Sequence, residues 1–398
     1  MNNRLIGKLP GGSSVVEVAH DRAIQHVDEL IYPPGTDVFV SPGFIDLQVN
    51  GFAGVDYNDP ASSRESISAS IRTMFTTGVT RFFATVITGS RERMLGALKN
   101  LAAAKEEFRR SGLPEADAME AFHVEGPHIS PEDGPRGAHP VEHVRPPDIE
   151  EFKRWQEVSD GNVRLVTVAP EWLESPAYIR VVTGSGVTVS IGHTRANSDQ
   201  IQAAVDAGAT MSTHLGNGAN STLPKTANYI WDQLAEDRLT ASFVVDGIHI
   251  PSSFLKSALR AKGVERSVLV TDAVMPAMCA PGPYQLGQVE VELRTDQSVV
   301  LRGGTRLAGS ALRMDHAIGN CVRLGRISLR EALAMATVNA ARVGRIPGRR
   351  GLTPGERADL VLFEWDEASL ILAIRQTVVA GQTVYATLGD TTGTAVHP

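Results

Sequence analysis

The feature of this sequence that most restricts its fold is a series of eight short apolar segments separated by amphipathic stretches. In stretches such as RESISASIRTMFTT and SSFLKSALRA, apolar residues recur every three or four positions, which indicates helices. Strands that alternate with helices form parallel sheets through right-handed crossovers. The eight apolar segments cover residues 44–48, 81–87, 122–126, 163–170, 187–193, 209–214, 242–247 and 267–272. Eight such units predict an α/β protein with a (β/α)8 TIM barrel.

The two ends of the chain have a different pattern, which predicts a second domain. Up to residue 42 the sequence reads as short β segments broken by Pro-Gly turns, and the tail after residue 350 is again rich in β segments. Terminal β segments on both sides of a barrel most simply pair with each other. We therefore expect residues 1–42 and 350–398 to form a small β-sandwich domain and residues 43–349 to form the barrel. A turn-rich stretch near 281–306 predicts a β insert close to the barrel mouth.

Composition and charge exclude several classes of protein. The apolar fraction of 42% and the charged fraction of 21% are those of an ordinary globular protein. No apolar stretch approaches the ~20 residues of a membrane span, and the first residues lack the apolar core of a secretory signal. Two isolated cysteines, Cys279 and Cys321, do not make a disulfide framework, so we expect a cytoplasmic protein without a membrane partner. A net charge of -7 argues against nucleic acid as a partner.

Polar residues mark the ends of seven of the eight predicted strands. In TIM barrels the carboxyl ends of the strands carry the active site. The polar residues at or just beyond these ends are Gln48, Asn50, Glu125, Glu171, His193, His214, Asp246, His249 and Asp272. The same pattern thus predicts both a fold and an active site.

Three of these residues form a candidate metal site. Seven of the eleven histidines lie between residues 123 and 249, and His193 and His214 each end a predicted strand, one βα unit apart. Glu125 ends an earlier strand of the same barrel. Two imidazoles and a carboxylate are a ligand set that leaves a fourth position open on a catalytic metal. The alternative is three unrelated polar residues, since a histidine considered alone is more often packed or solvent-facing than a ligand.

Asp272 is the candidate acid/base. A bound divalent metal lowers the pKa of water to ~7, but the proton must still be taken up and delivered. Asp272 ends the last predicted strand in LVTDA, where a carboxylate faces the barrel mouth. An aspartate at a strand end can instead cap the next helix, but the following Ala-Val-Met-Pro is a poor helix start. The predicted reaction class is metal-assisted hydrolysis of a carbonyl or phosphoryl compound.

A set of ordered motifs resembles a known family. The motifs are PGFIDLQVNG (42–51), FHVEGPHIS (122–130), RGAH (136–139), IGHT (191–194), THLGN (213–217), DGIHI (246–250), LVTDA (269–273) and LAGSA (307–311). In this order they resemble the N-acetylglucosamine-6-phosphate deacetylases of the amidohydrolase superfamily, and the resemblance covers nearly the whole chain.

The resemblance implies a TIM barrel with a small β-sandwich, a homodimer, and one divalent metal ion, Zn²⁺ or Fe²⁺. It also implies hydrolysis of the acetamide of N-acetylglucosamine-6-phosphate to glucosamine-6-phosphate and acetate. Carried over by position, Glu125, His193 and His214 resemble the metal ligands and Asp272 the general acid/base. His139 resembles the residue that polarises the acetyl carbonyl, and His249 one that contacts the sugar. The positions that line the substrate correspond to Ala138, Asn217, Gly218, Leu307, Ala308 and Gly309.

Two departures from the family pattern bear on the metal and on the substrate. The first strand carries Gln48 and Asn50 where many amidohydrolases carry His-x-His, so the second metal position is expected to be vestigial. Lys225 stands near the place of the arginine that binds the sugar phosphate, often across the dimer, but lysine lacks the bidentate fork. Deacetylation of another N-acyl amino sugar therefore stays open, whether N-acetylgalactosamine-6-phosphate or an unphosphorylated compound. A more distant alternative is a non-catalytic metal-binding or sugar-binding protein on this scaffold.

Overall fold

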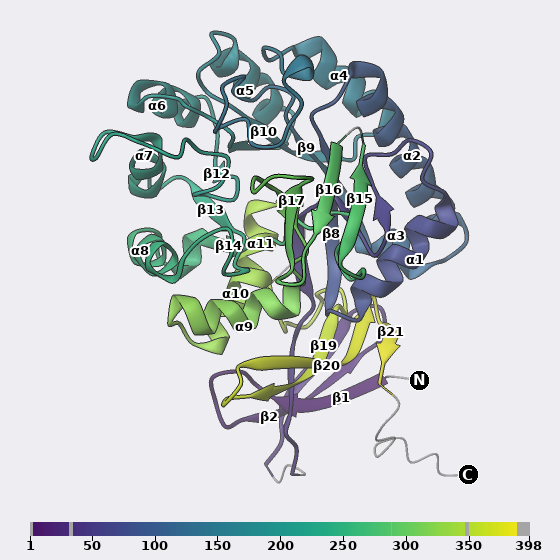
Figure 1. The fold of residues 1–398 in the computed structure, drawn as a ribbon. Coiled ribbons are helices and arrows are strands. Elements are labelled where there is room, and N and C mark those ends of the chain that lie inside the picture. The colour runs from purple at the N-terminus through teal and green to yellow at the C-terminus, as the bar shows by residue number, and fades with distance from the viewer. Residues whose placement is uncertain (1–2, 32–34, 288, 347–349, 388–398) are drawn as a thin grey trace.

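A barrel of eight parallel strands forms the centre of the molecule (Figure 1). The computed structural model describes residues 3–31, 35–287, 289–346 and 350–387. The barrel strands, in their order around the sheet, are β5 (Phe44–Val49), β8 (Val79–Ile87), β9 (Met119–Glu125), β10 (Val163–Val168), β11 (Thr188–Ile191), β12 (Met211–Ser212), β13 (Thr240–Phe243) and β14 (Ser267–Leu269). Backbone hydrogen bonds from Asp272 N to Gln48 O and from Asn50 N to Ala273 O close the ring. Each predicted strand overlaps one of these, so the predicted TIM barrel is confirmed.

Helices surround the barrel. They are α1 (Arg64–Phe75), α2 (Arg91–Arg110), α3 (Pro114–Ala118), α4 (Ile149–Val158), α5 (Ser175–Gly184), α6 (Ser198–Asp206), α7 (Tyr229–Ala235), α8 (Ser252–Lys262), α9 (Met314–Gly325), α10 (Leu329–Ala336) and α11 (Val338–Val343). Helix α1 illustrates how the sequence determines these helices. Ser63 caps its first turn by accepting a hydrogen bond from Ser66 N, and Ile67, Ile71 and Met74 are buried at helical spacing. None of the described helices is long and apolar enough to span a membrane.

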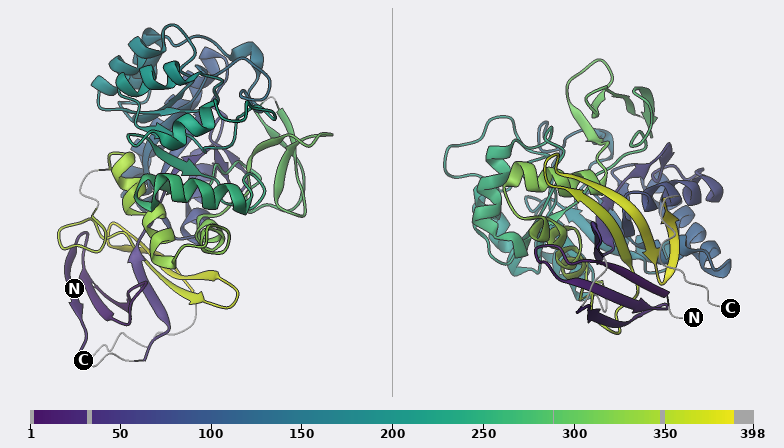
Figure 2. Two further views of the ribbon diagram at one scale, coloured as in Figure 1. Left: turned by 90° about the vertical axis from the view of Figure 1, so that its left-hand side faces the viewer. Right: turned by 90° about the horizontal axis from the view of Figure 1, so that it is seen from below.

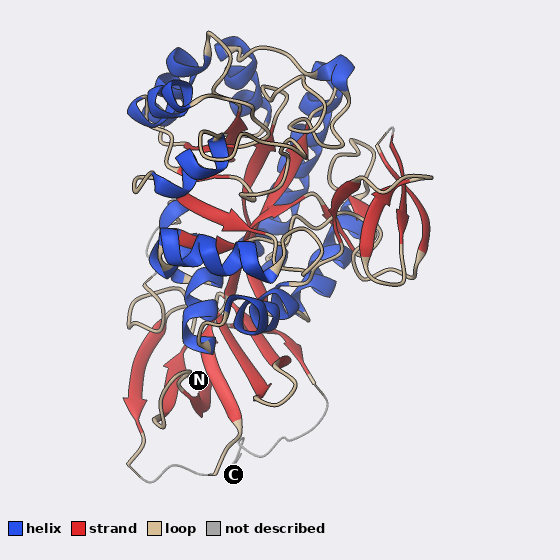
Figure 3. Ribbon diagram, turned by 60° about the vertical axis from the view of Figure 1, so that its left-hand side comes forward, coloured by secondary structure: helices blue, strands red, loops and turns tan. Residues whose placement is uncertain are grey.

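Strands from both chain ends form a second sheet below the barrel (Figure 3). Its seven strands are β1 (Asn3–Lys8), β2 (Val15–His20), β3 (Ile24–Glu29), β4 (Val38–Pro42), β19 (Leu360–Asp366), β20 (Ile371–Val379) and β21 (Gln382–Ala386). Val18 and Val40 from the N-terminal strands pack with Leu360 and Val378 in a core of their own. The expected small β domain built from both termini is thus present, and we propose residues 42 and 350 as its boundaries with the barrel.

The stretch after the last barrel strand forms a sheet of four antiparallel strands that stands beside the barrel (Figure 2). Its strands are β15 (Gly282–Leu286), β16 (Val289–Leu293), β17 (Ser298–Leu301) and β18 (Leu307–Ser310). The last of them returns to the barrel, because Ser310 N donates to the carbonyl oxygen of Asp272. This insert therefore lies against the strand end that carries Asp272. The short strands β6 (Gly51–Phe52) and β7 (Val55–Asp56) form a hairpin after β5.

Candidate metal and substrate site

The three predicted metal ligands meet at the carboxyl ends of β9, β11 and β12. Nε2 of His193 and Nε2 of His214 lie 3.1 and 2.8 Å from Oε1 of Glu125. One ligand atom from each residue lies within 4.8 Å of the other two, and all three side chains are buried. Strands far apart in sequence thus bring two imidazoles and a carboxylate into one cluster, which fits a divalent ion.

The surroundings of the cluster favour the protonation states in which its side chains can bind a cation. Nδ1 of His193 lies 2.8 Å from the carbonyl oxygen of Pro135. A proton on Nδ1 leaves Nε2 free to bind metal, which is the usual arrangement behind a metal-binding histidine. Burial alone would raise the pKa of Glu125, but the two neighbouring histidine side chains lower it well below its ordinary value. The carboxylate is therefore held in the charged form that a metal ligand needs.

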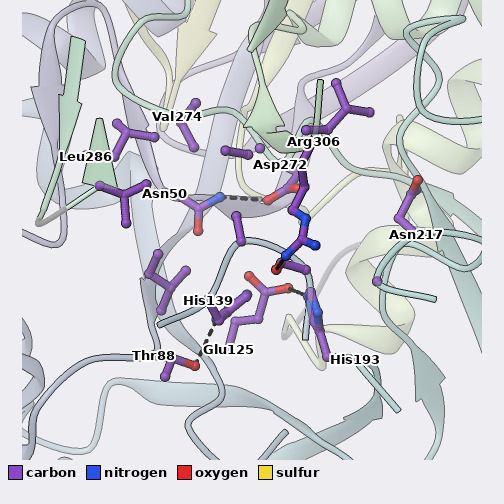
Figure 4. Close-up of a pocket in the computed structure, with 18 of the residues that line it drawn as sticks. Asn50, Thr88, Glu125, His139, His193, Asn217, Asp272, Val274, Leu286 and Arg306 are labelled. Atoms are coloured by element: carbon purple, nitrogen blue, oxygen red, sulfur yellow. Dashed lines mark hydrogen bonds and ion pairs between the residues drawn. The ribbon is translucent and has the colours of Figure 1, made fainter. Parts of the chain in front are cut away.

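Asp272 lies beside this cluster, and Figure 4 shows its hydrogen bond to Asn50, which follows the first barrel strand. Gln48 Nε2 and Asn50 Nδ2 donate to its Oδ1 at 3.1 and 2.7 Å. Burial, together with repulsion from the charge of Glu125, raises the pKa of Asp272. No helix begins at Asp272, so the sequence-based preference for a site residue over a helix cap agrees with the backbone.

The side chain of His139 packs against the metal cluster. Its ring centroid lies 4.5 Å from that of His193, and its Nδ1 lies 2.8 Å from the hydroxyl of Thr88. Burial, helped by the neighbouring His193, lowers the pKa of His139 to about 3. The imidazole is therefore neutral at physiological pH, and the hydrogen bond between its Nδ1 and the Thr88 hydroxyl fixes the orientation of the ring.

Thr88 is a site residue that the strand-end analysis missed. The segment 81–87 was the one predicted strand without a polar terminal residue, yet Thr88 follows it directly and lines the same cavity. Glycine at 126 makes room for this hydroxyl, since a Cβ there would lie 2.2 Å from the Thr88 Oγ1. Extending the strand-end rule by one residue would have found it.

The loop after β12 is pressed against His193. Gly218 has a φ of +56°, and a Cβ on it would lie 2.6 Å from Nδ1 of His193. Only glycine accommodates both the backbone conformation and this close approach. The neighbouring Asn217 Nδ2 is buried and has no hydrogen-bond partner within the described part of the chain.

A cavity of about 780 Å³ opens over these residues. Its lining includes the predicted residues Asn50, Glu125, Ala138, His139, His193, His214, Asn217, Gly218, His249, Asp272, Leu307, Ala308 and Gly309. His249 is fixed there by Asp246, whose Oδ2 lies 2.6 Å from the His249 Nδ1. Almost all of the predicted site residues thus surround one space.

Lys225 and Glu171 lie apart from this space. Lys225 is exposed in the loop before α7 and does not line the cavity. Glu171 accepts hydrogen bonds from the hydroxyl of Thr194 and from the backbone N–H of Arg195, so it organises the loop after β11. The position of Glu171 at a strand end did not indicate that its side chain forms hydrogen bonds within a neighbouring loop and does not enter the site.

This combination of a TIM barrel, a cluster of two histidines and a glutamate, and a neighbouring aspartate is typical of metal-dependent hydrolases. The family model described as "Amidohydrolase family" matches residues 39–384. The N-acetylglucosamine-6-phosphate deacetylase of Lysinibacillus sphaericus is 32% identical over 370 residues, which are 92% of this chain and 90% of the relative. The N-acetylgalactosamine-6-phosphate deacetylase of Escherichia coli O157:H7 is 33% identical over 325 residues, which are 81% of this chain and 83% of that one.

A solved structure gives the same result. The N-acetyl-D-glucosamine-6-phosphate deacetylase of Mycobacterium smegmatis, an aspartate-to-alanine variant in complex with N-acetyl-D-glucosamine-6-phosphate, is similar with a TM-score of 0.84. The two sequences are 28% identical, and the similarity covers 97% of this chain and 100% of that one. The chain belongs to the amidohydrolase family. Its family and its relatives support a hydrolase that acts on amide bonds.

Proposed function

We propose that this protein hydrolyses the acetamide of N-acetylglucosamine-6-phosphate to glucosamine-6-phosphate and acetate. The observation that carries the proposal is the cluster of Glu125, His193 and His214 beside Asp272 in one cavity. Curated relatives named for this activity match most of the chain, which supports the same substrate class.

The cluster is proposed to hold one divalent ion, Zn²⁺ or Fe²⁺. Its three nitrogen and oxygen donors fit either metal. When bound, such an ion would polarise the amide carbonyl and activate water. Gln48 and Asn50 stand where many family members carry the histidines of a second metal site. Their amide groups donate hydrogen bonds to Asp272. This arrangement supports a single metal ion.

The remaining steps fall to side chains of the cavity. His139, neutral and tied to Thr88, is placed to donate a hydrogen bond to the amide oxygen. Asp272 takes a proton from the attacking water and delivers it to the leaving nitrogen, so the C–N bond breaks to give a carboxylate and an amine. The raised pKa of Asp272 favours the proton-carrying state between these two transfers.

The sugar is proposed to occupy the side of the cavity with Asn217 and His249. The unpartnered Nδ2 of Asn217 offers a donor to a hydroxyl or phosphate oxygen, and Gly218 beside it exposes backbone. N-acetylgalactosamine-6-phosphate is the second candidate substrate, because a relative named for it is 33% identical.

The decisive test is Asp272→Asn. The amide keeps the shape of the carboxylate and an oxygen for Gln48 and Asn50, but it cannot carry the proton. We expect kcat on N-acetylglucosamine-6-phosphate to fall at least ~100-fold, the lower end of general acid–base effects. Metal content, measured by mass spectrometry of the purified protein, should stay the same. Retained activity would exclude Asp272 as the acid/base. A wild-type protein that holds metal but hydrolyses no N-acetylated hexosamine would support the binding-protein alternative.

We also propose a homodimer in which Lys225 serves the site of the partner subunit. Lys225 is exposed and outside the cavity of its own chain, although it stands near the position of the phosphate-binding arginine of the family. Lys225→Ala should raise the KM for phosphorylated substrate about 10-fold or more while kcat changes little, and leave an unphosphorylated analogue unaffected. Sedimentation would show whether the protein is a dimer. Equal KM values for wild type and variant would exclude a role of Lys225 in binding the phosphate.

Both cysteines, Cys279 and Cys321, are free, which supports the expected reducing, cytoplasmic compartment.

A further inference from the structure

The cavity has an aliphatic side that the proposed sugar does not use. Val86 from β8, Val274 beyond β14, and Leu286, Val289 and Val291 from the insert all line it. Figure 4 shows Leu286 and Val274 on the side of Asn50, across the cavity from Asn217. Polar groups that would bind a sugar therefore lie at one end and branched aliphatic side chains at the other, with the metal cluster and Asp272 between them.

The insert is built to present this aliphatic face. Its strands β15 and β16 pair Leu286 with Val289 and Tyr284 with Val291, so these side chains share one face. The alternate residues Gln285 and Glu290 are exposed on the other face. Val291 is fully buried, whereas Leu286 and Val289 are half-buried at the cavity. The apolar face of the β15–β16 hairpin therefore faces the cavity, and its polar face is exposed.

A hydrogen bond anchors the tip of the hairpin to the barrel. Gly287 N donates to Oδ2 of Asp56 at 3.1 Å. Arg93 approaches the same point, since a Cβ on Gly287 would lie 3.4 Å from its Nη2. Asp56 and Arg93 thus place polar groups beside the hairpin end of the aliphatic side.

The geometry of an amide indicates that the acyl chain of the substrate lies on this aliphatic side. A secondary amide is planar and trans, so its acyl chain and its nitrogen substituent point in opposite directions. With the carbonyl at the metal cluster and the sugar towards Asn217, the acyl chain points to Leu286 and Val289. An acetyl group offers a single methyl to this surface. The total cavity volume of about 780 Å³ lies in the upper part of the ~300–1,000 Å³ range of sites for drug-sized ligands.

We propose that the natural substrates include amino-sugar phosphates whose N-acyl chain is longer than acetyl. This inference rests on the proposed function and specifies the acyl group that the same site accepts. Water adds to the acyl carbon, both of its protons pass to the leaving nitrogen as the C–N bond breaks, and the products are the short-chain carboxylate and the ammonium form of the amino sugar. No redox partner or further reactant is needed.

The test compares N-acetyl, N-propanoyl, N-butanoyl and N-hexanoyl glucosamine-6-phosphate on the metal-loaded wild-type enzyme. Burying one methylene in an apolar site favours binding by about fourfold. We therefore expect kcat/KM to rise by about that factor for each of the first two methylenes. A fall of tenfold or more from N-acetyl to N-butanoyl would overturn the acyl-chain proposal and leave the deacetylase proposal standing. Hydrolysis of none of the four compounds would overturn the proposed function itself.

A pair of neighbouring substitutions locates the subsite. Val289→Phe fills the aliphatic side and should lower the ratio of N-butanoyl to N-acetyl kcat/KM at least tenfold. Glu290→Phe adds the same ring on the exposed face of the same strand, where it disturbs only an exposed ion pair with Arg302. That control should keep the wild-type ratio. Equal ratios in wild type and Val289→Phe would show that the acyl chain does not reach the insert.

Discussion

Three residues at the strand ends of this site have positive φ angles, a backbone conformation that residues other than glycine rarely adopt. His193, His214 and Asp272 have φ values of +50°, +26° and +52°. Each such residue costs of order 1–3 kcal/mol, which the surrounding structure must offset. All three turn their side chains over the barrel mouth at the point where the strand hydrogen bonding ends. Two proposed metal ligands and the proposed acid/base are therefore among the residues that carry backbone strain.

Thr88 is predicted to position His139. Its hydroxyl is the hydrogen-bond partner of the His139 Nδ1 at 2.8 Å, and both side chains are buried. Thr88→Val keeps the shape but removes the hydrogen bond, so the imidazole loses its fixed tautomer and orientation. Loss of one such hydrogen bond should lower kcat about 10-fold. Steady-state kinetics on N-acetylglucosamine-6-phosphate should show the loss in kcat, with KM nearly unchanged.

Thr88→Ser separates positioning from packing. Serine restores the hydroxyl without the methyl group, so kcat should return to within a factor of about two of the wild-type value. Bound metal should be equal in all three proteins, because the hydrogen bond of the Thr88 hydroxyl goes to His139 and not to a proposed ligand. If Thr88→Val and wild type had the same kcat, the hydrogen bond to His139 would have no part in the reaction.

At the scale of whole elements, the sequence predicted the barrel because its signals are local and repeated. Each apolar segment, such as 81–87 or 267–272, is short and lies between amphipathic helices, so its identity as a buried strand needs no tertiary information. The lengths were less predictable. Strand β12 has only Met211 and Ser212, because the chain leaves the ladder early and turns at His214 towards the metal cluster.

The roles of side chains depend on tertiary contacts that a sequence pattern does not contain. The resemblance to the family marked Gln48 and Asn50 as the remains of a metal position. In the structure their amide groups donate hydrogen bonds to Asp272, more than 220 residues away in the chain. In the same way, the turn-rich stretch 281–306 predicted strands near the mouth without showing which face they present. The pairing of Leu286 with Val289 and the anchor at Asp56 supply that information.

At the scale of the whole molecule, buried charged groups join parts of the chain that are distant in sequence. Arg81 of β8 forms an ion pair of 2.7 Å with Asp359 next to β19, and both side chains are almost completely buried. This pair connects the barrel to the terminal sheet. Asp46 of β5 accepts hydrogen bonds from the backbone N–H and the hydroxyl of Thr271 beyond β14. It therefore lies where the first and last strands close the barrel.

The closure at Asp46 predicts a pH dependence of stability. Burial raises the pKa of Asp46 to about 7, although hydrogen bonds from Thr271 and Gln48 oppose the shift. Between about pH 4 and 7 the folded state keeps this proton while the unfolded state has lost it. The contribution of Asp46 is therefore fully present below about pH 4 and is lost as the pH rises through 7. A shift of this size corresponds to a loss on the order of 4 kcal/mol.

Asp46→Asn tests this linkage, because asparagine fills the same space and does not titrate. We expect the free energy of unfolding of the wild type, measured by urea denaturation in chelator, to fall relative to that of Asp46→Asn as the pH is raised from 4.5 to 8. The exposed Asp28 on β3 supplies the matched control, and Asp28→Asn should follow the wild-type curve at every pH. Parallel curves for wild type and Asp46→Asn across the whole range would mean that Asp46 is charged in the folded barrel. The hydrogen bonds of Thr271 would then close the barrel around a carboxylate ion instead of a neutral acid.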